Sequence, residues 1–319
     1  MKPFLLLIFL LCAFAGADDE KCGPLLELQT VKFDETYVNA GKFQGYVELS
    51  NQKSLHVQHV KAKKGKPTIV FVNGLVYPNS RWDKVIAKFE AEGYGLIRYE
   101  FTNQATSLRH AGRSTEITTD SLATELRELL DRIHGSEKVE IVSLSYGSSI
   151  ATSFALKHPE RMASLTYLSP LVISLENYNP MGVMLKNQLA MTKFFGQVLY
   201  EASYQNSYMN FYRTSVKASP YEGVAVSVYQ ESLFHLGKAV RDFDLTKEIP
   251  KIDFDNIAIF IAEHEEGPAK KDMFKVWEYI QKKKNPYKIE LDGAHHALPD
   301  SKPDELFAEL MKRFALKTN

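Results

Sequence analysis

The sequence has few cysteines and no excess of either charge. Its 319 residues include 2 cysteines, which excludes a disulfide-built scaffold and a zinc-finger framework. Lys plus Arg and Asp plus Glu each number 39, so the formal net charge is zero. A chain without a basic excess is unsuited to coating a phosphate backbone, and we expect no nucleic-acid partner.

Long hydrophobic runs are also scarce, and the single one lies at the start of the chain. Residues 1–17 read MKPFLLLIFLLCAFAGA, with an early lysine, an apolar stretch and small residues in an A-x-A pattern. This layout predicts a cleavable signal peptide, too short to span a bilayer that needs about 20 helical residues. We expect a secreted or periplasmic protein with no stable membrane anchor. No N-x-Ser/Thr sequon is present, which favours a bacterial setting.

Short apolar runs alternate with helical segments along the rest of the chain. An alternating pattern over 36–62 predicts an antiparallel strand pair. The later runs are continuously apolar, as expected for strands buried on both faces of a parallel sheet. They cover 67–74, 94–101, 138–145, 164–171, 257–263 and 287–293. The pattern predicts an α/β fold with a mostly parallel sheet flanked by helices. Asp120 or Ser121 is expected to cap the helix that carries Leu122, Leu126 and Leu129.

One stretch interrupts this alternation. Residues 173–250 are too long for a loop and are rich in Met, Tyr and Phe. We interpret them as a helical cap inserted into a core formed by 18–172 and 251–319. Its apolar side chains either form the cap's own core or roof a pocket for an apolar substrate.

The sharpest chemical signal is the segment 141–151, IVSLSYGSSIA. An apolar strand ends at Ser145 and a helix follows at once, the layout of a nucleophile elbow. The tight turn needs small residues two positions to either side, here Ser143 and Gly147. A glycine is usual two positions before the nucleophile. Ser143 takes its place here, so the motif is S-x-S-x-G and not G-x-S-x-G.

A serine hydroxyl needs a base to take its proton, and the base needs an acid to orient it. His295 and His296 follow the last predicted strand, and both are candidate bases. Glu265 follows the strand before and leaves room for one helix and one strand before the histidines; Glu266 and Glu263 are alternatives. Adjacent histidines chelate one ion poorly and no third ligand is evident, so we expect no metal and no cofactor.

An acyl-transfer site also needs two N–H groups for the oxyanion. Tyr146, directly after the nucleophile, is expected to supply one. Leu75, after Asn73-Gly74 at the end of an early strand, is expected to supply the other.

These motifs together resemble the α/β-hydrolase superfamily over 36–316. The chain order of serine, acid and histidine matches it. The segment VNGLVYPNSRW resembles the family's His-Gly oxyanion segment, with Asn73 in place of the usual His, and FALKHPERM (154–162) resembles the stretch after the nucleophile helix. The resemblance implies the α/β-hydrolase fold, with an eight-stranded sheet.

The resemblance also selects among the candidates. Aligning GAHHALPDSKP on Pro303 makes His296 the catalytic histidine, and aligning IAEHEE on the family's Gly-x-x-Asp turn puts Glu265 at the acid position, with Ala262 for Gly. We therefore expect a carboxylesterase- or lipase-like serine hydrolase using Ser145, Glu265 and His296 on a small acyl substrate. A peptidase, lactonase, thioesterase or acyltransferase on the same triad is an alternative. A non-catalytic binding protein is a third possibility, motivated by the departures from the family motifs at Asn73, Ser143 and Ala262.

Overall fold

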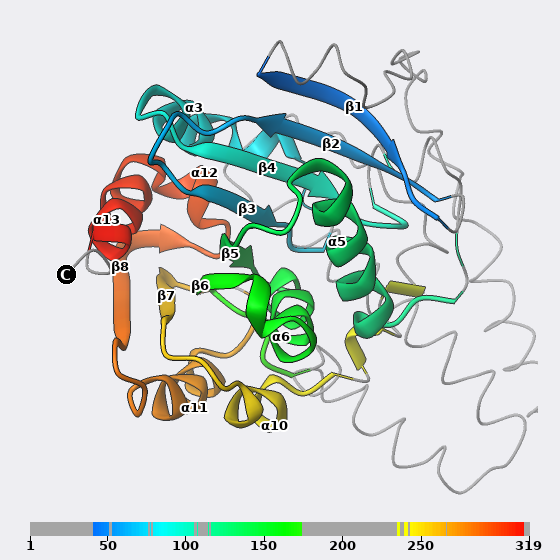
Figure 1. Cartoon of the computed structure of the whole chain (residues 1–319). Helices are drawn as coiled ribbons and strands as arrows, with labels where there is room; N and C mark the ends of the chain where they lie inside the picture. The colour runs from blue at the N-terminus through cyan, green and yellow to red at the C-terminus, as the bar shows by residue number, and fades with distance from the viewer. Residues whose placement is uncertain are drawn as a thin grey trace, which may run out of the picture.

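The computed structural model (Figure 1) describes residues 41–50, 53–75, 77, 79–104, 107, 114, 116–173, 235–236, 239–241, 243–265 and 267–315. The predicted signal peptide at 1–17 lies outside the described residues, and so does most of the predicted cap at 173–250.

The described residues form one eight-stranded sheet in the order β1-β2-β4-β3-β5-β6-β7-β8. Its antiparallel pairs are β1 with β2 and β2 with β4, whereas β4, β3, β5, β6, β7 and β8 run parallel. The strands are β1 Lys42–Glu48, β2 Ser54–Val60, β3 Thr68–Val72, β4 Gly95–Glu100, β5 Val139–Leu144, β6 Met162–Leu168, β7 Ile257–His264 and β8 Tyr287–His295. The predicted mostly parallel sheet is confirmed.

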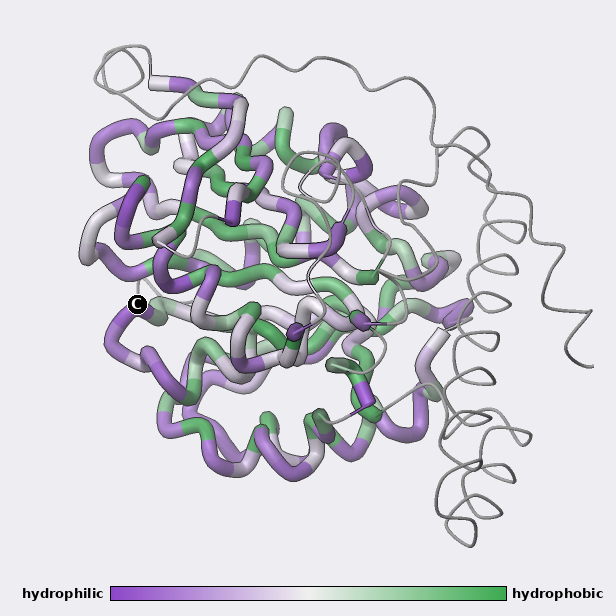
Figure 2. The backbone as a smooth tube through the Cα atoms, turned by 90° about the vertical axis from the view of Figure 1, so that its right-hand side faces the viewer, coloured by the Kyte–Doolittle hydropathy of each residue, from purple (hydrophilic) through white to green (hydrophobic). Residues whose placement is uncertain are grey.

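Burial explains why these segments are strands. Every residue of β3 and β5 is buried, as expected for central strands covered on both faces. The edge strand β8 instead alternates, and its exposed positions are Lys288, Glu290 and Asp292. Charges on an outer strand oppose pairing with another sheet. Figure 2 shows the same division, with hydrophobic segments inside and hydrophilic ones along the outer turns.

Helices cover both faces of the sheet (Figure 1). One face packs on α3 and α13 through a cluster that includes Phe71, and the other packs on α5, α6 and α11 through a cluster that includes Val70. These neighbours in β3 point to opposite faces. The helices are η1 Asn79–Trp82, α3 Asp83–Ala91, α5 Thr119–Ile133, α6 Gly147–Lys157, η2 Pro159–Arg161, α10 Leu245–Glu248, η4 Ile249–Lys251, α11 Lys270–Ile280, α12 Leu298–Ser301 and α13 Pro303–Ala315. No helix in the described residues is both long and apolar enough to cross a membrane.

The start of α5 differs from the sequence prediction. Asp120 or Ser121 was the predicted N-cap, but the cap is Thr118, whose hydroxyl accepts from the Ser121 N–H at 3.0 Å. Ser121 returns a bond to the Thr118 N–H, which completes a capping box. Asp120 is already bonded to Ser153 on α6 at 2.6 Å, and this bond holds the pKa of Asp120 below its usual value. The capping prediction was therefore wrong, because the Asp120 carboxylate bonds Ser153 on α6 and does not cap α5.

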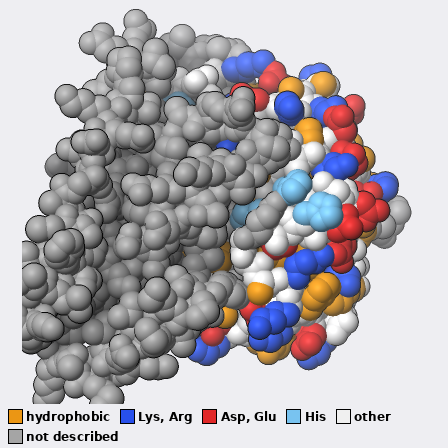
Figure 3. Space-filling model, turned by 180° about the vertical axis from the view of Figure 1, so that it is seen from behind, with side chains coloured by type: hydrophobic (Ala, Val, Ile, Leu, Met, Phe, Trp, Pro, Cys, Tyr) orange, Lys and Arg blue, Asp and Glu red, His pale blue; other side chains and the backbone are white. Residues whose placement is uncertain are grey.

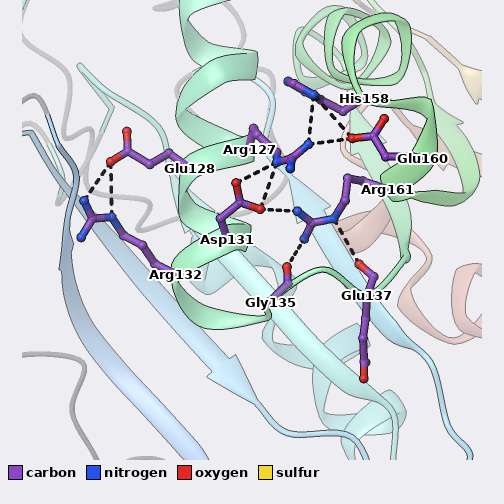
Figure 4. A network of polar contacts seen from close by, with 9 residues as sticks. All are labelled: Arg127, Glu128, Asp131, Arg132, Gly135, Glu137, His158, Glu160 and Arg161. Carbon is purple, nitrogen blue, oxygen red and sulfur yellow. Dashed lines mark hydrogen bonds and ion pairs between the residues drawn. The ribbon is translucent and has the colours of Figure 1, made fainter.

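A polar network closes the opposite end of α5 (Figure 4). Arg161, whose side chain is 2% exposed, donates to the backbone oxygens of Gly135 at 2.5 Å and Glu137 at 3.3 Å, and pairs with Asp131. Arg127 donates to the same Asp131 at 2.8 Å. The Arg161 guanidinium thus satisfies two backbone carbonyls of the turn that follows α5. The arginine of the FALKHPERM segment thus joins α5 to β6 at the amino edge of the parallel strands.

Candidate active site

Ser145 occupies a strained turn between β5 and α6. Its φ is +52°, in the left-handed region that non-glycine residues rarely adopt. The Ser145 N–H donates to the Leu168 oxygen at 3.0 Å, and the Ser145 oxygen accepts from Ser148 at 3.0 Å and Leu171 at 3.1 Å. Neighbouring backbone therefore holds the strained residue at the carboxyl edge of the sheet, where the α6 N-terminus begins.

The residues two positions to either side of Ser145 are small for different reasons. A Cβ on Gly147 would lie 2.3 Å from the Val72 oxygen, so only glycine fits there. Ser143 is buried, and its hydroxyl lies 3.3 Å from both the Ser148 hydroxyl and the Thr166 backbone oxygen. The serine that departs from the usual glycine is accommodated because its one polar atom has partners.

Glu265 and His296 come together at the same edge of the sheet. Glu265 follows β7 and His296 follows β8, a neighbouring parallel strand. His296 Nδ1 lies 2.6 Å from Glu265 Oε1, an ion-pair distance, and the side chains are 24% and 1% exposed, respectively. A carboxylate on Nδ1 favours the tautomer whose Nε2 carries the free lone pair, which is the form a general base requires.

Gly267 packs directly against this pair. Its N–H donates to Glu265 Oε1 at 2.8 Å. A Cβ on Gly267 would lie 3.2 Å from that oxygen and 3.3 Å from His296 Nδ1. The turn after β7 therefore packs tightly beside the carboxylate–imidazole contact, and a side chain at position 267 would require the neighbouring atoms to move.

The alternative candidates have other contacts. Glu263 is exposed, and its carboxylate accepts from the Gly293 N–H at 2.6 Å. The His295 ring lies 5.4 Å from the His264 ring, centroid to centroid. Figure 3 shows histidine side chains beside acidic ones on this face. Glu266 lies outside the described residues.

The position after β6 holds Ser169, whose hydroxyl accepts from the Ala262 N–H at 3.1 Å. Ser169 also has a positive φ, of +38°.

The loop after β3 lies against Ser145. A Cβ on Gly74 would be 3.1 Å from the Ser145 Cβ. Within the described part of the chain the next N–H, that of Leu75, has no acceptor. Tyr146 stands at the N-cap of α6, where backbone N–H groups lack intrahelical partners. Its buried hydroxyl lies 3.2 Å from that of Thr119. Tyr146 thus directly follows Ser145, and Leu75 lies in the loop that packs against Ser145. These are the two residues predicted to supply the oxyanion N–H groups.

Asn73, which stands where relatives usually have His, is buried in a network. Its Nδ2 donates to Asn79 Oδ1 at 2.9 Å and to the Tyr99 oxygen at 3.1 Å, and its Oδ1 accepts from Trp82 Nε1 at 2.6 Å. All of its polar atoms are bonded, so Asn73 anchors the start of the oxyanion-side loop.

Sequence reasoning missed Gln104, which is fully buried after β4. Its Nε2 donates to the backbone oxygens of Gly74 at 3.1 Å and Tyr77 at 2.7 Å. It therefore holds both ends of the turn that contains Leu75. No local pattern marks this residue, because its partners lie 30 and 27 positions away.

The described residues contain no group of three or more His, Cys, Asp or Glu side chains that could hold a metal. The arrangement instead offers a hydroxyl, an imidazole with a buried carboxylate, and backbone N–H groups. These are the parts required for acyl transfer through a serine ester.

Comparisons with known proteins agree with this fold. A family model described as "alpha/beta hydrolase fold" matches residues 67–223. The chain is 32% identical over 135 residues to "Probable lysophospholipase BODYGUARD 2" of Arabidopsis thaliana, a stretch that covers 39% of this chain and 28% of that protein. The chain therefore spans well under half of that relative's length.

Solved structures show the same architecture. The enol-lactonase of Burkholderia xenovorans LB400 superposes with a TM-score of 0.63 at 17% identity, covering 85% of this chain and 99% of the other. A thermophilic esterase of Thermogutta terrifontis gives a TM-score of 0.63 at 11% identity, covering 87% and 100%. At these identities the likeness shows the fold. With the family match over 67–223 and the sheet order, it follows that the chain has the α/β-hydrolase fold.

Proposed function

We propose that this protein is a serine hydrolase that cleaves an ester bond, with Ser145, His296 and Glu265 as its triad. The observation that carries the proposal is the left-handed Ser145 between β5 and α6, pressed against Gly74 of the oxyanion-side loop. Strain of this kind persists where the surroundings enforce it, and it clusters at functional sites. The 2.6 Å contact between Glu265 and His296 supplies the acid and base on the same edge.

The proposed reaction has two halves. Ser145 Oγ attacks the acyl carbon while His296 Nε2 takes the hydroxyl proton, and the carbonyl electrons move to oxygen. The C–O bond to the alcohol then breaks, and His296 returns the proton to the departing oxygen. Water attacks the resulting serine ester with His296 again as base, which releases the carboxylic acid and regenerates Ser145.

Electrostatics determine the barrier in both halves. The Tyr146 and Leu75 N–H groups would bind the oxyanion, where loss of one such donor typically costs about 2.7–4 kcal/mol. Glu265, with a nearly fully buried side chain, would stabilise the imidazolium that forms in each half. The N-terminus of α6 adds a favourable field at the developing negative charge.

An apolar acyl group is the proposed substrate feature. The Met- and aromatic-rich segment 173–250 supports it, and the similar proteins above include a probable lysophospholipase and an esterase.

The test is hydrolysis of p-nitrophenyl esters of increasing acyl length by the protein, by Ser145→Ala and by Ser169→Ala. Ser169 is the matched control, since it is also a serine with positive φ at the end of the next strand. Turnover should vanish with Ser145→Ala and persist with Ser169→Ala. Retained turnover in Ser145→Ala would refute the proposal. Lactones, thioesters and aminoacyl amides, tested in parallel, assign the bond that is cleaved.

We also propose that residues 1–17 direct export. Expression of the full chain followed by N-terminal sequencing of the extracytoplasmic protein tests this. A mature start shortly after Ala15 or Ala17 is expected. Recovery of an uncleaved cytoplasmic chain would contradict it.

A further inference from the structure

The carboxylate of Asp300 joins two loops that come from distant strands. Asp300 lies on α12, four residues after His296, and its side chain is 13% exposed. Its Oδ2 accepts from the Tyr77 hydroxyl at 3.0 Å and from Arg81 Nη1 at 3.0 Å. Tyr77 lies two residues after Leu75, in the loop that follows β3. In the sheet, β5, β6 and β7 separate β3 from β8.

On the β3 side, the partners of Asp300 are tightly held. The Tyr77 backbone oxygen and the Gly74 oxygen both accept from Gln104, so a shift of Tyr77 would carry the intervening Leu75 with it. The Arg81 guanidinium lies over the Tyr77 ring at 5.2 Å. Gly74 has no slack, because its Cβ position is 3.1 Å from Ser145.

On the β8 side, Asp300 belongs to the single turn that carries His296. The Leu298 N–H donates to the His296 oxygen at 3.0 Å, and the Asp300 N–H donates to the Ala297 oxygen at 3.0 Å. The Ser301 hydroxyl accepts from the His295 N–H at 3.1 Å. These bonds therefore tie the turn that contains Asp300 to the backbone of His295 and His296.

The same link is not needed to hold this side of the molecule together. The helices α3 and α13 already pack through an edge-to-face contact between Phe89 and Phe307, 4.8 Å between centroids. Burial raises the pKa of Asp300, while Arg81 and Tyr77 oppose that effect. A carboxylate kept in such a place, beside a core that is already apolar, points to a role other than cohesion.

We propose that Asp300 is a positioning residue that fixes the oxyanion-side loop relative to His296 through Tyr77 and Arg81. The inference rests on the proposed function above. Acyl transfer requires the oxyanion donors and the base to be placed around one acyl carbon, and small misplacements are costly. Asp300 connects the two segments that carry them.

The test compares Tyr77→Phe with Tyr287→Phe in the full protein. The Tyr287 hydroxyl donates to Glu309 at 2.8 Å, so this control also loses a tyrosine–carboxylate bond, but at the opposite end of β8. For Tyr77→Phe, kcat should fall about tenfold or more with KM changed less than about twofold. For Tyr287→Phe, kcat should stay at the wild-type value. Equal kcat in the two variants would overturn the proposal.

Asp300→Asn and the double variant Tyr77→Phe/Asp300→Asn complete a cycle. If both act through one link, the double variant should have a kcat near that of the lower single variant, whereas independent effects would multiply. Multiplying effects would overturn the proposal. If Asp300→Asn does not fold, Tyr77→Phe still tests the proposal, because that variant removes only the hydroxyl that donates to Asp300.

Ser145→Ala distinguishes a failure of the proposed function from a failure of the positioning role alone. If it retains turnover, the proposed function fails whatever the Tyr77 result. If it is inactive while Tyr77→Phe matches Tyr287→Phe, the positioning role alone fails.

Discussion

The two edges of the parallel strands turn the chain in different ways. In the described residues, the non-glycine positions with positive φ are Asn103, Ser145 and Ser169, which follow β4, β5 and β6 at the carboxyl edge. At the amino edge the positive-φ residues are glycines: Gly65, Gly93 and Gly135 precede β3, β4 and β5. Gly41 precedes β1, and Gly293, within the last residues of β8, is the exception.

The difference shows where strain is retained. A glycine reaches positive φ at little steric cost, so the amino-edge turns are relaxed. A serine or asparagine at positive φ costs energy, and it persists only where its surroundings hold it. Asn103 is held by two bonds of 2.7 Å to the Ser114 backbone, and Ser145 by three backbone bonds. The candidate site therefore lies on the edge that stores strain, and the other edge stabilises the fold.

The largest expected effect tests the carboxyl edge. Glu265→Gln removes the charge that would stabilise the imidazolium and should lower kcat by about 10³–10⁴. The thermal midpoint should change little, because Gln can still accept the Gly267 N–H. Steady-state hydrolysis and a melting curve measure both. Glu263→Gln, which alters the exposed carboxylate bonded to Gly293, is the control. An equally low kcat in Glu263→Gln would show that the loss of activity is not specific to Glu265.

The next prediction tests the amino edge. Arg161→Ala removes a buried guanidinium that bonds the Gly135 and Glu137 oxygens and Asp131. It should lower the free energy of unfolding by roughly 3 kcal/mol. The activity per folded molecule should be unchanged. Urea unfolding and active-site titration measure the two quantities, and a parallel loss of kcat per titrated site would break the division between the edges.

Acid should destabilise the fold through His59 on β2. Burial, with His134 and Lys61 adding to it, lowers the pKa of His59 from its ordinary 6.5 to about 4. The unfolded chain therefore binds the proton at higher pH, and the free energy of unfolding falls as the pH drops from 6.5 to 4. The loss is up to about 3 kcal/mol and levels off below pH 4.

His59→Gln should flatten this part of the stability curve, measured by urea unfolding at a series of pH values. His264→Gln, at an exposed position of β7, should keep the wild-type slope. An unchanged slope in His59→Gln would assign the acid sensitivity to another group.

The smallest effect concerns the relaxed glycines. Gly135 has a φ of +67°, and a Cβ there meets nothing within 4 Å. Gly135→Ala should therefore cost about 1 kcal/mol, all of it conformational. Gly65→Ala, also free of contacts at φ +82°, should cost the same. Chemical denaturation of both variants checks this, and the absence of any loss would mean that the amino-edge turns relax to negative φ.

Local patterns were sufficient to predict the strands and the elbow. Continuous apolar runs become buried parallel strands because both faces of the sheet are covered, and Ser145 was identifiable from one strand, one turn and one helix. The order of Glu265 and His296 along the chain was also readable. Their contact depends on the register of β7 and β8, which shifts between Ala262 and His264.

Long-range contacts could not be predicted in this way. Tyr77 and Asp300 are 223 positions apart, and they meet because α12 packs against η1. Gln104 lies in a loop with no periodicity to mark it. Thr118 was missed as a cap because the competing residue, Asp120, is bonded to α6. In each case the deciding partner belongs to another element.

The network around Asn73 has a consequence for how this sequence can change. Its amide bonds Asn79, Trp82 and the Tyr99 oxygen at once, so the side chain is matched to three surrounding groups. The imidazole usual in relatives has two ring nitrogens and a different shape. A neutral imidazole offers one donor and one acceptor, so a single exchange to histidine would leave at least one of the three partners unpaired. An exchange at position 73 would therefore be tolerated best together with a change at position 79 or 82, the side chains that bond it.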